Sequence, residues 1–133
     1  MKGKIGIWID KRVAKLFAAE SENELQIIES DIEEFRPKGG YGGRHKGGPQ
    51  DVVQDRKYTQ REKHQYKEYF KEIASKLQGA SSVVIFGPAQ TGEKFYKELS
   101  LSYPKLAQKV SGVEKADSMT DNQVKSWVRD YYS

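Results

Sequence analysis

The sequence predicts a single α/β domain built on a mixed β-sheet. Three observations support this class: apolar residues alternate near the N-terminus, they recur every three or four positions from Tyr66 to Leu77, and a continuous apolar run occupies residues 83–86. A chain of 133 residues can bury one modest core but not two. We therefore expect residues 1–133 to form one domain.

Three strands are expected first. Isoleucine occupies every second position from Ile5 to Ile9, which is the period of two typical of a strand. The segment Val13–Glu20 follows after a short connection, which favours a hairpin. A turn then leads to a third strand that begins at Leu25. Consecutive strands joined in this way predict an antiparallel meander.

A flexible, basic, glycine-rich loop is predicted at residues 36–56. Its centre, PKGGYGGRHKGGPQ at Pro37–Gln50, contains six glycines, two prolines and three cations but no aliphatic side chain. Such a segment cannot join a core, and glycine-rich segments are usually flexible. Long loops inside compact domains are uncommon and often functional, so both a plain linker and a functional loop remain open.

Helices and strands alternate in the remainder of the chain. A helix is expected from Tyr58 to Gly79, and its first half, which lacks aliphatic residues, should project beyond the core. A strand is expected at Ser81–Pro88 and another at Lys109–Val113. The last helix should begin at a T-x-x-Q capping box starting at Thr120.

The motif GPAQTG, residues 87–92, precedes the second helix. It lacks the pattern GxxxxGK[ST] of a phosphate loop. We therefore interpret it as a tight strand-to-helix turn with Thr91 as the N-cap.

The predicted element order is β-β-β-α-β-α-β-α, with a five-stranded mixed sheet covered by helices. This is the order of ribonuclease-H-like folds, whose nucleases hold two magnesium ions with several carboxylates. The acidic candidates for that chemistry are Asp10, Glu29, Asp31, Asp117 and Asp121. Acidic residues at strand ends and turns are common, however, and fold analogy alone is weak support for a nuclease.

The composition of the chain excludes several kinds of covalent link, metal site and membrane segment. The chain has no cysteine, which excludes disulfides and thiolate metal sites. No apolar stretch has the length of a membrane span, and the N-terminal apolar run is too short for a signal peptide. We expect a cytoplasmic protein with no membrane partner and no cofactor, and we interpret His64 as a surface residue that binds no metal.

Positive charge is concentrated in one segment. The net charge is −3 for residues 1–35, +6 for residues 36–67 and +1 for residues 68–133. A basic cluster attracts polyanions in a salt-dependent manner. The candidate RNA-binding residues are Arg36, Lys38, Tyr41, Arg44, His45, Lys46, Arg56, Lys57, Arg61, Lys63, His64 and Lys67. The alternative is a solvated helix face, interrupted by Glu62.

Two phrases resemble a known family. They are VVIFGPAQTGEKFYKEL at residues 83–99 and ADSMTDNQVKSWVRDYY at residues 116–132. Together with the element order and the basic loop, they resemble the middle domain of the eukaryotic and archaeal peptide-chain release factor and of its Pelota-type relatives, including small bacterial members. The likeness extends over nearly the whole chain. It implies the ribosome, rRNA or tRNA as partners.

In release factors, as this resemblance implies, the loop carries a GGQ tripeptide that helps water attack the peptidyl-tRNA ester. The candidate catalytic residues here are Gly47, Gly48 and Gln50. This sequence departs from the family by inserting Pro49, which locks φ and removes an amide proton. Pelota-type members lack the tripeptide and act in ribosome rescue. The chain is also too short to include the codon-reading and GTPase-recruiting domains of complete release factors.

Three functions remain open at this point. The resemblance and the charge favour a ribosome- or tRNA-associated RNA-binding module, in ribosome rescue, hibernation or translation regulation, over an enzyme. The second function is peptidyl-tRNA ester hydrolysis by the Gly47–Gln50 loop. The third is a non-ribosomal interaction module whose loop folds on a protein partner.

Overall fold

The computed structural model describes residues 1–21, 24–32, 49–88 and 90–133, and it describes residues 49–59 by their backbone alone. The predicted α/β domain with a five-stranded mixed sheet is confirmed. The strands are β1 (Gly3–Ile9), β2 (Val13–Ala18), β3 (Leu25–Glu29), β4 (Ala80–Gly87) and β5 (Val110–Lys115). The helices of the described residues are α2 (Pro49–Lys76), α3 (Thr91–Ser102), α4 (Pro104–Ala107) and α5 (Asp121–Tyr132).

The sheet has the strand order β3-β2-β1-β4-β5. The first three strands form the predicted antiparallel meander, and β4 adds to β1 in parallel, followed by β5 in parallel. The register places Ile7 of β1 opposite Leu16 of β2 and Ile85 of β4. The central strands β1 and β4 are therefore surrounded by protein on both edges and both faces.

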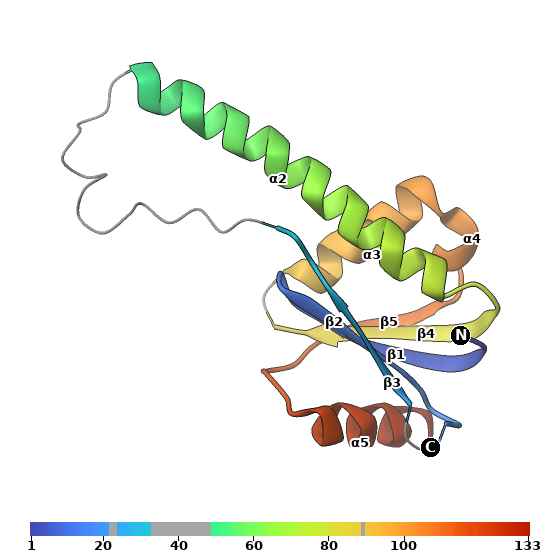
Figure 1. Cartoon of the computed structure of the whole chain (residues 1–133). Helices are drawn as coiled ribbons and strands as arrows, with labels where there is room; N and C mark the ends of the chain where they lie inside the picture. Colours follow the sequence, from blue (N-terminus) through green and yellow to red (C-terminus); the bar gives the residue numbers. More distant parts are fainter. Residues whose placement is uncertain (22–23, 33–48, 89) are drawn as a thin grey trace.

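The molecule has three layers (Figure 1): α2, α3 and α4 cover one face of the sheet, and α5 covers the other. Ile5, Ile7 and Ile9 pack into the core beneath α2 and α3 and are fully buried. Burying one such side chain stabilises the fold by about 1.5–3 kcal/mol. The intervening Trp8 packs with Phe86 against α5 on the opposite face. Alternate residues of β1 thus pack into two apolar clusters, one on each face of the sheet.

Helix α2 starts earlier than the sequence predicted. It begins at Pro49 instead of Tyr58, so residues 49–56 belong to the helix and not to the predicted loop. Proline suits the first position of a helix because its φ is already helical and its missing N–H needs no partner there. The helix extends past the edge of the sheet in Figure 1, as the lack of aliphatic residues at positions 58–65 predicted.

One smaller prediction about the helices was wrong, and one short helix was not predicted. Thr91 is the first residue of α3 and not its N-cap, which is Gln90. The Gln90 carbonyl already accepts a hydrogen bond from the Lys94 amide at 3.0 Å, so Thr91 falls inside the first turn. The four-residue helix α4 was not predicted, because so short an element shows no hydrophobic period.

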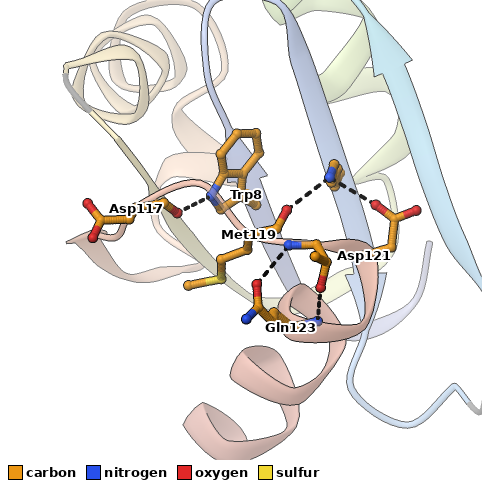
Figure 2. Close-up of polar contacts among 7 residues, drawn as sticks. Trp8, Asp117, Met119, Asp121 and Gln123 are labelled. Atoms are coloured by element: carbon orange, nitrogen blue, oxygen red, sulfur yellow. Dashed lines mark hydrogen bonds and ion pairs between the residues drawn. The ribbon is translucent and has the colours of Figure 1, made fainter.

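The capping box of α5 is confirmed. The Thr120 amide donates to Gln123 Oε1 at 2.9 Å, and the Gln123 amide donates to Thr120 Oγ1 at 3.2 Å. Figure 2 shows how the preceding loop is held: Trp8 Nε1 donates to the Asp117 carbonyl at 3.1 Å. The Trp8 bond thus fastens the loop before α5 to β1.

Among the described residues, no helix has both the length and the hydrophobicity that crossing a bilayer requires.

Gly6 sets how closely α5 approaches the sheet. A Cβ on Gly6 would overlap both methyl groups of Val128 on α5. We expect Gly6→Ala to lower the free energy of unfolding by about 1–3 kcal/mol through overpacking. In a double-mutant cycle, Val128→Ala should relieve about 1 kcal/mol of that cost. Urea denaturation of the four proteins measures this coupling, and strictly additive effects would contradict the contact.

Tyr69 docks α2 onto the end of β1. Its ring is 3% exposed, and its hydroxyl donates to the Asp10 carbonyl at 3.0 Å. Burial, with a smaller contribution from the Asp10 charge, raises the pKa of Tyr69 well above its ordinary value near 10. The folded protein therefore keeps this proton after the unfolded chain has released it.

This shift predicts a loss of stability in alkali. The contribution of protonated Tyr69 is complete below about pH 10 and falls as the pH rises above that value. Tyr69→Phe should cost about 1 kcal/mol at pH 8 through the lost hydrogen bond, and it should flatten the decline between pH 9.5 and 11. Urea denaturation across this range measures both effects. Tyr96→Phe, at a tyrosine that is 39% exposed, is the control and should leave the slope unchanged.

A candidate nucleic-acid interface between α2 and α3

The predicted site residues fall into three groups. Lying outside the described residues are Arg36, Lys38, Tyr41, Arg44, His45, Lys46, Gly47 and Gly48. Gln50, Arg56 and Lys57 lie in the first turns of α2, where only the backbone is described. Arg61, Lys63, His64 and Lys67 lie further along α2 with exposed side chains. The catalytic hypothesis for the loop therefore stays a prediction.

The last four residues do not share one face of α2. Lys63 and Lys67, four positions apart, lie on the side that faces α3. His64 lies on the side that faces β3, in a groove with Glu29, Asp31 and two further glutamates. Arg61 lines neither groove. Of these four residues, Lys63 and Lys67 therefore share a groove, whereas the neighbouring His64 does not, because successive residues of a helix point about 100° apart.

A groove with a cavity volume of about 380 Å³ runs between α2 and α3. We call it the α2–α3 groove. It is lined by Lys63 and Lys67 from α2 and by Lys94 and Lys97 from α3. Their four ammonium groups outnumber the two carboxylates that also line the groove, those of Glu62 and Glu98. The groove therefore carries a positive charge along its length.

The groove wall is partly aromatic. Tyr66 and Phe70 contribute to it from α2, and Leu101, which is 73% exposed, contributes from α3. The Phe70 ring contacts the Phe95 ring of α3 with centroids 5.2 Å apart, which fixes the distance between the helices. Lys94 Nζ lies 4.9 Å from the centroid of the Tyr66 ring, a cation–π contact. The aromatic wall therefore sets the spacing of the two helices and holds Lys94 in place.

Sequence reasoning missed the lysines of α3. They lie in a segment whose net charge is only +1, because its cations are interspersed with acids such as Glu93 and Glu98. Their spacing of three positions on a predicted helix was the available signal. Their approach to Lys63 and Lys67 depends on the packing of α3 against α2, which lies outside any local pattern.

The acidic candidates for a nuclease are divided between several places: Glu29 and Asp31 line one groove, and Asp117 lines another. Asp10 Oδ1 accepts hydrogen bonds from the amides of Arg12 and Val13, both at 2.8 Å, and so closes the turn between β1 and β2. Asp121 pairs with Lys15 at 2.9 Å at the start of α5 (Figure 2). Within the described part of the chain, no three acidic or histidine side chains converge in a way that suits a metal ion. These positions give the nuclease interpretation no support.

The fold is similar to that of part of a solved translation termination factor. The chain is similar to the crystal structure of an archaeal translation termination factor, aRF1, with a TM-score of 0.53 and 12% sequence identity over 97% of this chain. This similarity shows the fold alone, and it confirms the structural part of the predicted resemblance. The chain spans 38% of the length of that factor. No protein-family model and no curated protein matches the sequence.

Proposed function

We propose that this protein is an RNA-binding module of the release-factor middle-domain type, which contacts ribosomal or transfer RNA through the α2–α3 groove. The observation that carries the proposal is the convergence of Lys63, Lys67, Lys94 and Lys97 on one groove. Similarity to a translation termination factor supports a role in translation, such as ribosome rescue, hibernation or regulation.

The charge distribution around α2 favours one orientation of RNA. Lysines gather on the α3 side, whereas on the β3 side the four carboxylates of Glu29, Asp31, Glu68 and Glu72 outnumber the ammonium group of Lys71. A phosphate backbone is attracted to the first side and repelled from the second. The aromatic wall of the groove adds an apolar surface against which sugars or bases can pack.

The predicted loop cations extend the same proposal. Residues 36–48 immediately precede α2, whose first turns lie beyond the edge of the sheet (Figure 1). Arg44 and Lys46 would add phosphate contacts, and Tyr41 or His45 would stack on a base. Most of this segment lies outside the described residues, so the α2–α3 groove is the part of the interface that the experiments below address.

Replacing the four groove lysines tests the proposal. We expect the Lys63→Gln, Lys67→Gln, Lys94→Gln and Lys97→Gln quadruple variant to bind ribosomes or tRNA at least about tenfold more weakly at low salt, because each lost phosphate contact removes counterion release. The slope of log affinity against log salt should decrease by about 0.7 per lost contact to single-stranded RNA. Filter binding across a salt series measures both quantities.

The matched control neutralises four exposed lysines elsewhere, Lys2, Lys71, Lys76 and Lys105, and therefore changes the net charge by the same amount. It should keep most of the affinity and of the salt slope. If the control loses as much binding as the groove variant, the binding is a general charge effect and the assignment of the groove is wrong.

Glu98 provides a test in the opposite direction. Its carboxylate lines the groove and its Oε2 accepts a hydrogen bond from Ser102 Oγ at 2.8 Å, which a glutamine oxygen can also accept. Glu98→Gln should strengthen RNA binding about two- to fivefold, since it removes one like charge from the path of the phosphates. Glu72→Gln, on the acidic side of α2, is the control. Equal effects of the two substitutions in filter binding would contradict the proposed orientation.

A further inference from the structure

A second cavity, of about 530 Å³, opens where β1 and β4 end. We call it the edge crevice. The two strands are parallel neighbours, so their carboxyl ends meet at one edge of the sheet. The chain leaves β1 towards β2 on one side and leaves β4 towards β5 on the other. Open α/β sheets bind ligands at such a switch point, outside the carboxyl ends of the strands.

The N-terminus of α3 forms one wall of the edge crevice, through Gln90 and Thr91. The N-cap residue Gln90 makes no side-chain capping bond. The first-turn amides of Thr91, Gly92 and Glu93 have no acceptor within the helix, and the helix dipole gives them a partial positive charge. Gly92 lets this end approach the sheet closely, because a Cβ there would lie 3.1 Å from Ile85 Cγ2.

The side chain of Thr91 is a second and independent sign of a ligand. Thr91 is 7% exposed, so more than nine-tenths of this polar residue is buried. Its hydroxyl has no hydrogen-bond partner among the described residues. Every fully enclosed polar side-chain atom of the described residues does have a partner. The hydroxyl must therefore be reachable from solvent, and the space beside it is the edge crevice. The protein thus leaves this donor, on a residue that is otherwise buried, open to a group bound in the crevice.

The charges around the edge crevice are mainly positive. Lys94, one turn into α3, and Lys115, at the end of β5, both line it. Lys11 also lines it and pairs with Glu62 at 3.1 Å. Glu93 lies in the first turn of α3, is exposed and does not line the cavity. The crevice is therefore lined by three ammonium groups and one carboxylate, that of Glu62. This excess of positive charge suits a small anion.

We propose that the edge crevice binds one phosphate group. The first-turn amides of α3 and the Thr91 hydroxyl donate hydrogen bonds to its oxygens, and Lys94 and Lys115 balance its charge. The site does not require the α2–α3 groove to bind RNA. The phosphate can belong to a free small molecule or to the 5′ end of an RNA strand, and the experiment distinguishes these sources.

The test is a titration of the protein with inorganic phosphate at constant ionic strength, followed by the ¹⁵N–¹H NMR shifts of the Thr91, Gly92 and Glu93 amides. We expect saturable shifts centred on these amides. Thr91→Val keeps the shape of the side chain but removes the donor, and it should weaken phosphate binding about tenfold or more. Thr91→Ser, which keeps the donor, should bind within about threefold of the original protein.

Thermal unfolding without phosphate separates a binding role from a structural one. Because the Thr91 hydroxyl has no partner in the described chain, Thr91→Val should be at least as stable as the original protein. Shifts that arise elsewhere, an absence of saturation at high millimolar phosphate, or unchanged phosphate binding by Thr91→Val would each overturn the proposal.

The source of the phosphate is resolved by competition. Titrations with a nucleoside monophosphate and with a short RNA, with and without a 5′-phosphate, are compared with inorganic phosphate. Preference for the 5′-phosphorylated RNA supports an RNA end, and equal binding of the small phosphates supports a free ligand. The Lys63→Gln, Lys67→Gln and Lys97→Gln triple variant should lose RNA affinity yet bind inorganic phosphate normally, so the RNA proposal and the phosphate proposal can fail separately.

Discussion

The parallel pairing of β1 with β4 is the constraint from which the rest of the structure follows. Its register places Ile7 beside Ile85 on one face and Trp8 beside Phe86 on the other. Each face of this central pair is consequently apolar, and each needs its own helical cover. Helix α5 can lie close to the sheet because Gly6 has no side chain. Within the sheet, Gly87, with φ at +150°, passes so near the Ile9 carbonyl of β1 that a Cβ would overlap it.

The same pairing assembles the polar edge of the molecule. Because β1 and β4 run in the same direction, the Asp10 turn and the turn after Gly87 emerge side by side. Tyr69 attaches α2 to the first turn through the Asp10 carbonyl, and the second turn leads directly into α3. Helix α2 is thus held at this edge by Tyr69, α3 begins there, and the Phe70–Phe95 contact sets the space between them. The α2–α3 groove and the edge crevice are therefore consequences of the core.

The sequence could predict what depends on local pattern. The isoleucines of β1, the apolar run of β4 and the Thr120 capping box carry periodic or positional signals, and each element appeared where expected. The position of Thr91 could not be predicted. A threonine before a helix is typical of an N-cap, and only the backbone of Gln90 shows that Thr91 lies one position inside the helix. Helix boundaries and hydrogen-bond partners of this kind depend on tertiary packing.

The candidate site was less accessible from sequence, for a physical reason. A count of charge along the chain grouped Lys63, His64 and Lys67, but a helix distributes consecutive residues around its axis. Lys63 and Lys67 lie in the α2–α3 groove, whereas His64 lies on the acidic side of α2. The groove is completed by Lys94 and Lys97, which follow Lys67 by 27 and 30 positions in the sequence. Lysines that are distant in the sequence lie close together only because α2 and α3 pack against each other through Phe70 and Phe95.

Lys94 links the two surfaces. It lines both the α2–α3 groove and the edge crevice, and its ammonium group lies 4.9 Å from the Tyr66 ring centroid. A cation–π contact at a solvent-accessible site is worth about 0.5–1 kcal/mol, whereas a hydrogen bond to a charged group is worth about 1.5–3 kcal/mol. A phosphate within reach in either cavity would therefore draw Lys94 away from Tyr66. Because one ammonium group cannot satisfy two phosphates fully, the residues that define each surface are the ones they do not share: Thr91 and Lys115 for the edge crevice, and Lys63, Lys67 and Lys97 for the groove.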